Sequence, residues 1–390
     1  MNNLLKEAEE LFSYTQSLRR DFHRHPELGF EEVRTSGIVA QELRALGLEV
    51  TAGVAKTGVV AVLEGEKPGP VILARFDMDA LPIQEDTGAD YQSQNPGLMH
   101  ACGHDGHTAV GLTVAKILAK HQEELAGKVK LIFQPAEEGL GGAKLMVKEG
   151  VLEDPKPDKI LALHLWNELP VGWVVAAEGP TMAASETFHV RITGKGGHGA
   201  HPHNTIDPIF AGSQIVTALQ GIVSRNVEPK KSAVVSVTTF HAGETFNVIP
   251  QEAVLSGTIR TFEPEVRQLV LERFKEIVSN IAVANSCQVE IELESVTLAL
   301  INDAAITRKV QNLVKEKYPD FQLITNYQTM GSEDMAYMMG DIPGCYFFVG
   351  SNNSDRGLDA KHHHPKFDFD EQALVVSTAL MSQSILSLTE

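Results

Sequence analysis

Cysteine is scarce in this sequence. The 390 residues include only three cysteines, Cys102, Cys287 and Cys345, and these are widely separated. An odd and scattered set argues against a disulfide framework and against a structural zinc site built from four cysteines. Cys287 and Cys345 are interpreted as core residues, whereas Cys102 lies in a histidine-rich stretch and requires another explanation.

Positive charge is also scarce. The chain has 33 Lys and Arg residues against 51 Asp and Glu residues, a net charge of −18, and no basic cluster interrupts this acidity. Nucleic-acid binding requires clustered cations that neutralise phosphates, so we expect no nucleic-acid partner. An anionic substrate would have to be held by a local cation, against the field of the whole protein.

Long hydrophobic runs are missing. No apolar stretch approaches the roughly 20 residues that cross a bilayer. The amphipathic, charged N-terminus has no signal-peptide core or cleavage pattern. We therefore expect a cytoplasmic protein with no membrane partner. At 390 residues the chain is too long for one ordinary hydrophobic core, which favours two domains.

The first part of the chain alternates apolar strand patterns with helical patterns. Strands are predicted at 57–65, 70–79, 128–138 and 158–166, and helices at 3–23, 34–46, 107–121 and 140–149. Nearly continuous apolar strands separated by helices are typical of a buried, mostly parallel sheet. After about residue 295 the same style returns, with helices at 303–317 and 370–387 around the strand "GCYFFVG".

The pattern differs between these two parts. From "ETFHVRITGKGGHG" onward the order is strand, helix (206–226), two strands, helix (263–284) and strand. This order is typical of an α+β unit with an antiparallel, ferredoxin-like sheet. We therefore predict an α/β catalytic domain of residues 1–182 and 295–390, with an α+β domain of residues 183–294 inserted into it.

Metal-capable side chains follow several of the predicted buried strands. The stretch "MHACGHDGHTAV" holds Cys102 and His104, and "KHHHPKFDFDE" holds three consecutive histidines. The predicted strands end in Asp77 and Asp79, in Glu137 and Glu138, and in His164. Ligands of open α/β sheets collect beyond the carboxyl ends of the strands, so these segments are expected to meet at one edge.

The residue types predict the kind of metal and a division of roles. Thiolate, imidazole and carboxylate together suit Zn²⁺, Mn²⁺ or Co²⁺ better than Mg²⁺ or Ca²⁺, which prefer oxygen ligands. Of two adjacent glutamates, one can bind metal while the other takes a proton from water. Spacing alone does not distinguish His362, His363 and His364 as the ligand from the last segment.

Eight motifs in register give the chain a family resemblance. "HACGHDGHT", "QPAEEG", "HLW", "GKGGHGAHPH", "FNVIP", "GTIRTF", "GSED" and "HHPKFDFDE", in this order, resemble the aminoacylase/carboxypeptidase family of metal-dependent peptidases. The nearest likeness is to its amidohydrolase branch, which includes hippurate hydrolases, N-acyl-amino-acid deacylases and auxin-conjugate hydrolases. The resemblance runs from "RRDFHRHPELGFEE" to the final helix and implies hydrolysis of an N-acyl amino acid.

The resemblance also implies roles for particular residues. The metal ligands would be Cys102, His104, Glu138, His164 and His363, with Glu137 as general base. His363 is chosen because it lies two residues before Pro365. Relatives outside this branch have a His-x-Asp motif where this chain has "DMDALP", with Asp77 in place of the histidine. Cys102 and His104 compensate, and one or two divalent ions are expected.

The inserted domain would complete the site. By the resemblance it serves as a lid and dimerisation domain, and His198 reaches the partner subunit's active site to stabilise the oxyanion. Asn247 and Arg260 would contact the substrate, and Arg260 would hold its carboxylate, which a guanidinium suits well. His201 and His203 lie beside His198 and are candidates for substrate contact, and a homodimer or higher homo-oligomer is expected.

Several other histidines and acidic residues are interpreted as structural rather than as metal ligands. His23, His25, His121, His189 and His241 are interpreted as surface or capping residues, and His100 and His107 as outer partners of the ligands. Asp77 and Asp79 would cap the end of their strand, with Asp79 orienting a ligand. Glu333 and Asp334 would either form a pair at a helix N-terminus, stabilised by the helix dipole, or lie near the site, as the "GSED" match implies. Alternative functions are a dipeptidase or carboxypeptidase, a non-enzymatic amino-acid or peptide binder, and a thiol-dependent hydrolase with Cys102 as nucleophile.

Overall fold

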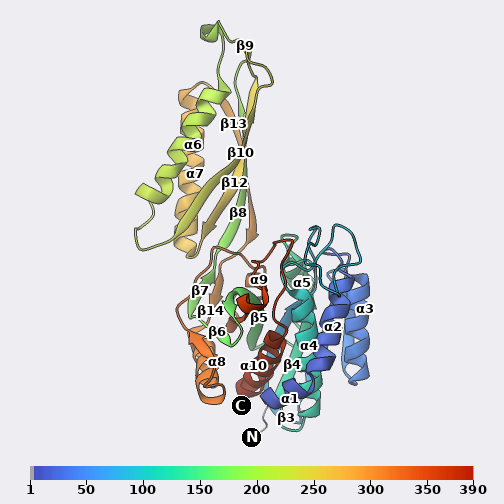
Figure 1. The fold of residues 1–390 in the computed structure, drawn as a ribbon. Helices are drawn as coiled ribbons and strands as arrows, with labels where there is room; N and C mark the ends of the chain where they lie inside the picture. Colours follow the sequence, from blue (N-terminus) through green and yellow to red (C-terminus); the bar gives the residue numbers. More distant parts are fainter. Residues whose placement is uncertain (1–3, 390) are drawn as a thin grey trace. The chain divides into compact units, whose positions relative to one another are not determined.

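The computed structural model describes residues 4–389 and contains two compact units (Figure 1). Unit 1 consists of the chain up to Gly179, Ile301–Tyr327 and the chain from Asp334 onward. Unit 2 consists of Pro180–Leu300 and Gln328–Glu333.

Unit 1 is built on a mixed eight-stranded sheet with a parallel centre. In spatial order the strands are β1 (Glu49–Val54), β2 (Gly58–Glu64), β4 (Ala126–Gln134), β3 (Lys67–Asp77), β5 (Lys159–Pro170), β16 (Gly344–Asn352), β6 (Trp173–Val175) and β15 (Gln322–Ile324). The four central strands, β4, β3, β5 and β16, pair in parallel. The predicted α/β class is therefore confirmed, and the carboxyl ends of these four strands share one edge.

Helices cover this sheet. They are α1 (Leu4–Glu10), α2 (Phe12–Arg24), α3 (Val33–Ala45), α4 (His104–Lys120), α5 (Gly142–Lys148), α8 (Ala304–Lys317), α9 (Ala336–Met339) and α10 (Gln372–Thr389). Helix α10 is the one helix of residues 4–389 that is long and apolar enough to cross a membrane. Most of α10 is buried in unit 1, where Leu374, Leu380 and Ile385 belong to the core, so it is explained as a core helix.

Two helix predictions need correction. The predicted single helix 3–23 is interrupted at Leu11, where ψ is 2°, so α1 and α2 are separate. The predicted helix 107–121 begins earlier, at His104, because Gly103 adopts a left-handed conformation (φ 91°) that turns the chain directly into α4. His104 therefore lies on the first turn of the helix, together with His107.

Unit 2 has the predicted order of strands and helices. β8 (Ala184–Thr193), α6 (Pro208–Arg225), β10 (Ala233–Ala242), β12 (Glu252–Thr261), α7 (Pro264–Ala284) and β13 (Gln288–Thr297) form an antiparallel sheet in the order β10-β12-β8-β13. This is the ferredoxin-like arrangement. Apolar side chains of the sheet, such as Val190 and Leu255, form one core with Ile215 of α6 and Phe274 of α7.

Short elements complete the chain. β9 (Gly197–His198) pairs with β11 (Val248–Ile249), and β7 (Gly179–Met182) pairs with β14 (Leu300–Asn302). Two 3-10 turns are present at Pro202–Asn204 and Ser354–Arg356.

Candidate metal centre

The ligand-type side chains predicted from the sequence converge in unit 1, beyond the carboxyl ends of the central strands. Cys102, His104 and His164 form one group whose ligand atoms all lie within 4.8 Å of one another, and Cys102, Glu138 and His363 form a second. Glu137 lies within the same limit of His104 and Glu138. Four distant segments thus meet at one site, and Cys102 belongs to both groups of possible ligands.

His104 has a fixed orientation. Its Nδ1 donates a hydrogen bond to the backbone oxygen of Asp79 (2.9 Å) and lies 3.3 Å from the Asp79 carboxylate. Its Nε2 is buried and has no hydrogen-bond partner among residues 4–389. A histidine that donates through one nitrogen presents the other as an acceptor or metal ligand, so Asp79 selects the tautomer that a metal needs.

His164 is held in the same way. Its Nδ1 donates to the backbone oxygen of Leu165 at 2.5 Å, and its Nε2 lies 3.4 Å from the Sγ atom of Cys102. The imidazole and the thiol therefore face each other across a short gap.

Glu137 and Glu138 follow β4 between two left-handed residues. Ala136 has a φ of 55° and Gly139 a φ of 76°, both in the left-handed region. The backbone N–H of Glu138 donates to Asp79 Oδ2 (3.0 Å), whereas a carboxylate oxygen of Glu137 accepts from the backbone N–H of Asp334 (3.4 Å). The backbone of Glu138 and the carboxylate of Glu137 are thus held by different parts of the molecule.

The three consecutive histidines have different surroundings. His363 has a φ of 64°, and its Nε2 lies 3.3 Å from Glu138 Oε1. His362 donates from Nε2 to the backbone oxygen of Leu165 (3.0 Å), and His364 accepts from the backbone N–H of Lys366 (3.0 Å). Of the three, His363 is therefore the one that joins the cluster. Its strained conformation is of the kind found at functional sites.

The electrostatics of the cluster favour a cation. Burial and the Glu138, Glu137 and Asp77 carboxylates raise the pKa of the Cys102 thiol well above its ordinary value. Although burial opposes it, Asp77 and Asp79 raise the pKa of His104 to about 10. Thiol, imidazole and carboxylate groups that crowd together in this way fit a divalent metal, which would stabilise the thiolate and neutralise the carboxylates.

His107 and Asp77 support the site from behind. His107 donates from Nδ1 to Asp77 Oδ1 (2.6 Å), and its Nε2 accepts from the backbone N–H of Leu165 (2.9 Å). Both ring nitrogens of His107 are therefore engaged. Both nitrogens of His100, by contrast, lack a hydrogen-bond partner among residues 4–389, and burial lowers the pKa of this imidazole to about 4.

The surface or capping interpretation is wrong for His23 but fits His121, which is the C-cap residue of α4. His23 is fully buried, and it lies 2.8 Å from Asp105 and 3.3 Å from Glu85. His121 is also buried and lies 2.9 Å from Glu7. The partners of His23 are distant in the sequence, and nothing near this histidine indicates them, whereas His121 also pairs with nearby Glu124 (3.0 Å).

Two buried arginines were missed in the sequence. Arg75, in the apolar strand β3, binds Asp77 (2.6 Å) and Asp334 (3.3 Å). Arg19 of α2 binds Asp105 (2.8 Å) and Asp368 (2.7 Å). A charge within the apolar run "PVILARFDMD" was the available signal for Arg75, because a buried guanidinium requires buried carboxylates.

The remaining predicted site residues lie in unit 2. His198 is on β9, and its Nδ1 accepts from the backbone N–H of Ala200 (3.0 Å). His201 and His203 follow it, with ring centroids 6.0 Å apart, and Asn247 precedes β11. Arg260 on β12 is half-buried, and its guanidinium has no hydrogen-bond or ion-pair partner within residues 4–389.

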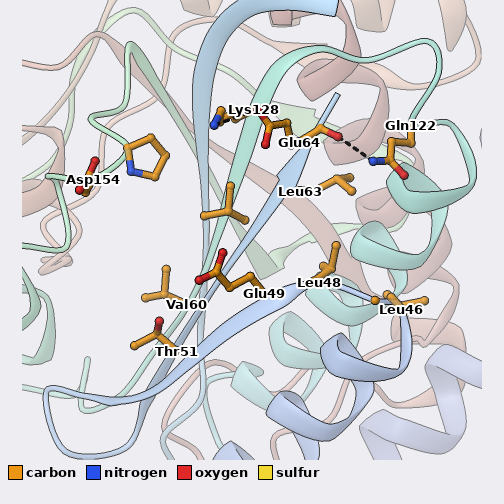
Figure 2. Close-up of a pocket in the computed structure, with 13 residues that line it drawn as sticks. Leu46, Leu48, Glu49, Thr51, Val60, Leu63, Glu64, Gln122, Lys128 and Asp154 are labelled. Carbon is orange, nitrogen blue, oxygen red and sulfur yellow. Dashed lines mark hydrogen bonds and ion pairs between the residues drawn. The ribbon is translucent and has the colours of Figure 1, made fainter. Parts of the chain in front are cut away.

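A separate hollow in unit 1 lies among other residues. It has a volume of about 470 Å³ and is lined by apolar side chains such as Leu48, Val60 and Leu63, with Glu49, Glu64, Lys128 and Asp154 around them (Figure 2). Lys128 lies 3.0 Å from Glu64, and Gln122 donates to the Glu64 backbone oxygen (2.8 Å). No residue of the metal cluster lines this hollow.

Comparison with known proteins agrees with this geometry. The chain is 41% identical over 373 residues to the N-acetyl-L-cysteine deacetylase of Bacillus subtilis, covering 96% of this chain and 88% of the relative. It is 38% identical over 379 residues to thermostable carboxypeptidase 1 of Saccharolobus solfataricus, covering 96% and 95%.

A solved structure agrees as well. The Bacillus subtilis YXEP protein, described as a dinuclear metal binding peptidase from the M20 family, superimposes with a TM-score of 0.85 at 36% identity, covering 98% of this chain and 99% of that one. A sequence profile matches residues 73–387, which is more than half of the chain. The chain is thus a hydrolase of amide bonds and belongs to peptidase family M20/M25/M40.

Proposed function

We propose that this protein hydrolyses the amide bond of N-acyl amino acids with the help of a divalent metal held by Cys102, His104, Glu138, His164 and His363. The observation that supports this most directly is the convergence of these five side chains beside Glu137. The buried Nε2 of His104 has no hydrogen-bond partner among residues 4–389, and His104 belongs to the same cluster, so this atom can serve as a metal ligand.

The donor set favours zinc, manganese or cobalt. A thiolate and three imidazoles are softer than the oxygen ligands that magnesium and calcium prefer. Cys102 belongs to both groups of ligand atoms, and these two groups together would hold two ions. When bound, a divalent metal polarises the scissile carbonyl and acidifies water.

The protein side chains supply the remaining chemistry. Glu137 accepts a proton from the attacking water at its carboxylate and passes it to the leaving amine. His198 stabilises the oxyanion, Arg260 holds the substrate carboxylate, and Asn247 and His203 contact the substrate. The half-buried, unpaired guanidinium of Arg260 supports this role, since burial already lowers its pKa and a carboxylate would compensate for the lost hydration.

Residues 183–294 act as a lid and dimerisation domain in this proposal, and the protein works in the cytoplasm as a homodimer or higher homo-oligomer. Edge strand β10 supports the pairing. Its sequence "AVVSVTTFHA" contains no Lys, Glu or Pro, whereas the opposite edge, β13, carries three glutamates. Natural edge strands use charge to prevent pairing, so β10 is the edge suited to a second copy.

Two other functions use the same residues differently. A dipeptidase or carboxypeptidase would need the same metal centre, and the similarity to a carboxypeptidase keeps this as the second candidate. A thiol-dependent hydrolase would need Cys102 as a free thiolate, which the raised pKa of this thiol opposes. A non-enzymatic binder would need no general base, so Glu137 would have no role in it.

Metal removal and substrate screening test the proposal. A chelator should abolish activity, and Zn²⁺, Mn²⁺ or Co²⁺ should restore it. The metal-loaded enzyme should then be assayed against acetyl and benzoyl amino acids and against dipeptides. Full activity after verified metal removal would contradict the proposal, and faster cleavage of dipeptides than of every acyl amino acid would favour the second candidate.

A further inference from the structure

A buried polar network lies behind Glu137 and centres on Asp334. The Asp334 side chain accepts hydrogen bonds from Gln134 (2.7 Å), from the backbone N–H of Ala143 (2.9 Å) and from Arg75 (3.3 Å). Both Asp334 and Arg75 are almost completely buried. Three donors from β3, β4 and the start of α5 thus fix one carboxylate.

The backbone of the same residue contacts the proposed general base. The N–H of Asp334 donates to Oε1 of Glu137 at 3.4 Å. A backbone N–H can be placed accurately only if its segment is held, and α9 (Ala336–Met339), which follows, is only a single turn. The Asp334 side chain supplies the missing anchor, because it ties this segment to the edge of the sheet.

The network continues to the ligand side of the cluster. Arg75 also donates to Asp77 (2.6 Å), and Asp77 accepts from His107 (2.6 Å). His107 in turn accepts from the backbone N–H of Leu165, next to His164. The ligand-bearing strand thus has contacts of its own, through Asp77 and His107, which do not involve Asp334.

From this geometry we infer that Asp334 is a positioning residue for the reaction, which holds Glu137 in place through its own backbone N–H. The inference rests on the proposed role of Glu137 as general base. Replacing Asp334 should affect only the carboxylate of Glu137, because Asp334 lies outside both groups of ligand atoms that contain Cys102. A merely structural role for Asp334 would instead affect every variant equally.

A double-mutant cycle in the metal-loaded enzyme tests this. D334A should lower kcat by about 10- to 100-fold while KM and metal content stay unchanged, since a misplacement of ~1 Å can cost about 100-fold. In the E137Q background D334A should produce no further loss. D334N keeps one accepting oxygen and should retain more activity than D334A. If D334A does not fold, D334N replaces it in the double-mutant cycle.

D368N is the matched control. Asp368 is likewise buried and paired with a buried arginine, Arg19 (2.7 Å), but it has no contact with Glu137. D368N should lower the melting temperature without the loss of kcat. If the Asp334 variant lowered kcat equally in the unsubstituted enzyme and in E137Q, only the positioning role would be overturned. An E137Q enzyme with normal kcat would overturn the proposed general base, and the positioning role with it.

Discussion

Glu137 and Glu138 are neighbours in the sequence, yet their surroundings differ. Glu138 lies 3.3 Å from His363, and its backbone is held by Asp79. Glu137 is held from the other side by the N–H of Asp334. The left-handed conformation of Ala136 turns the chain directly before these two residues. A metal ligand and a proton acceptor can therefore come from consecutive positions.

Glu137→Gln should keep the metal and lose most activity. The amide preserves size and polarity but cannot accept the proton, and general base catalysis contributes typically about 10²–10⁴-fold. The measurement is kcat together with metal content per subunit. Glu138→Gln is the matched variant and should lower metal content instead. Near-normal kcat with full metal in Glu137→Gln would show that the base is another group.

Cys102→Ser should weaken metal binding. Serine forms an alkoxide far less readily than cysteine forms a thiolate, so one ligand is lost at the position shared by both groups. Metal affinity is measured by competition with a chelator. In the unsubstituted enzyme a denaturing quench during turnover should trap no acyl-enzyme. A stoichiometric acyl adduct on Cys102 would identify it as a nucleophile rather than a ligand.

At the scale of secondary structure, α4 connects packing with metal binding. A Cβ atom at Gly106 would meet Leu165 Cδ1 at 2.6 Å and Phe369 Cζ at 2.9 Å, and one at Gly111 would meet Phe76 at 2.6 Å. The two glycines let the helix lie close to the sheet. Because α4 begins at His104, this close approach also sets how far the imidazole reaches into the cluster.

Gly106→Ala and Gly111→Ala form a matched pair. Overpacking typically costs about 1–3 kcal/mol, partly offset by the better helix propensity of alanine, so both variants should have a lower melting temperature. Gly106→Ala, two residues from His104, should also bind metal more weakly, whereas Gly111→Ala should not. Equal metal affinity in both variants would mean that the start of α4 does not set the ligand position.

The elements also show which features the sequence could predict. Apolar strands separated by helices indicated the α/β fold, which is confirmed, and the ends of those strands indicated where polar segments would meet. Four of these segments do converge in unit 1. The rule that polar groups collect at the carboxyl edge of a sheet needs only that the strands run parallel, and apolar strands separated by helices indicate this.

Other features depend on contacts that local patterns do not contain. His23 was expected at the surface and is buried, because Asp105 and Glu85 pair with it from distant parts of the chain. The orientation of His363 depends on a left-handed backbone conformation that no neighbouring glycine signals. Only the assembled fold shows these partners.

At the scale of the whole molecule, the proposed dimer makes a prediction about mixed subunits. His198→Ala and Glu137→Gln should each be nearly inactive, but a mixture should regain activity, because one site of each mixed dimer contains both groups. With random exchange about half of the dimers are mixed, so roughly a quarter of wild-type activity is expected. Subunit exchange is verified by mass. Exchange without recovery would show that His198 does not act across subunits.

The place of β16 in the sheet has a consequence for synthesis of the chain. β5 pairs with β16, whose Gly344 lies opposite Ile160, so the neighbour of β5 is made roughly 180 residues later. At about 5–20 residues per second, a ribosome needs on the order of 10–40 s to supply it. Throughout this interval the apolar strand "KILALHLW" has an open edge. We expect nascent chains stalled before Gly344 to be cut by protease near β5 and to bind chaperones there, and the complete chain to be protected from both.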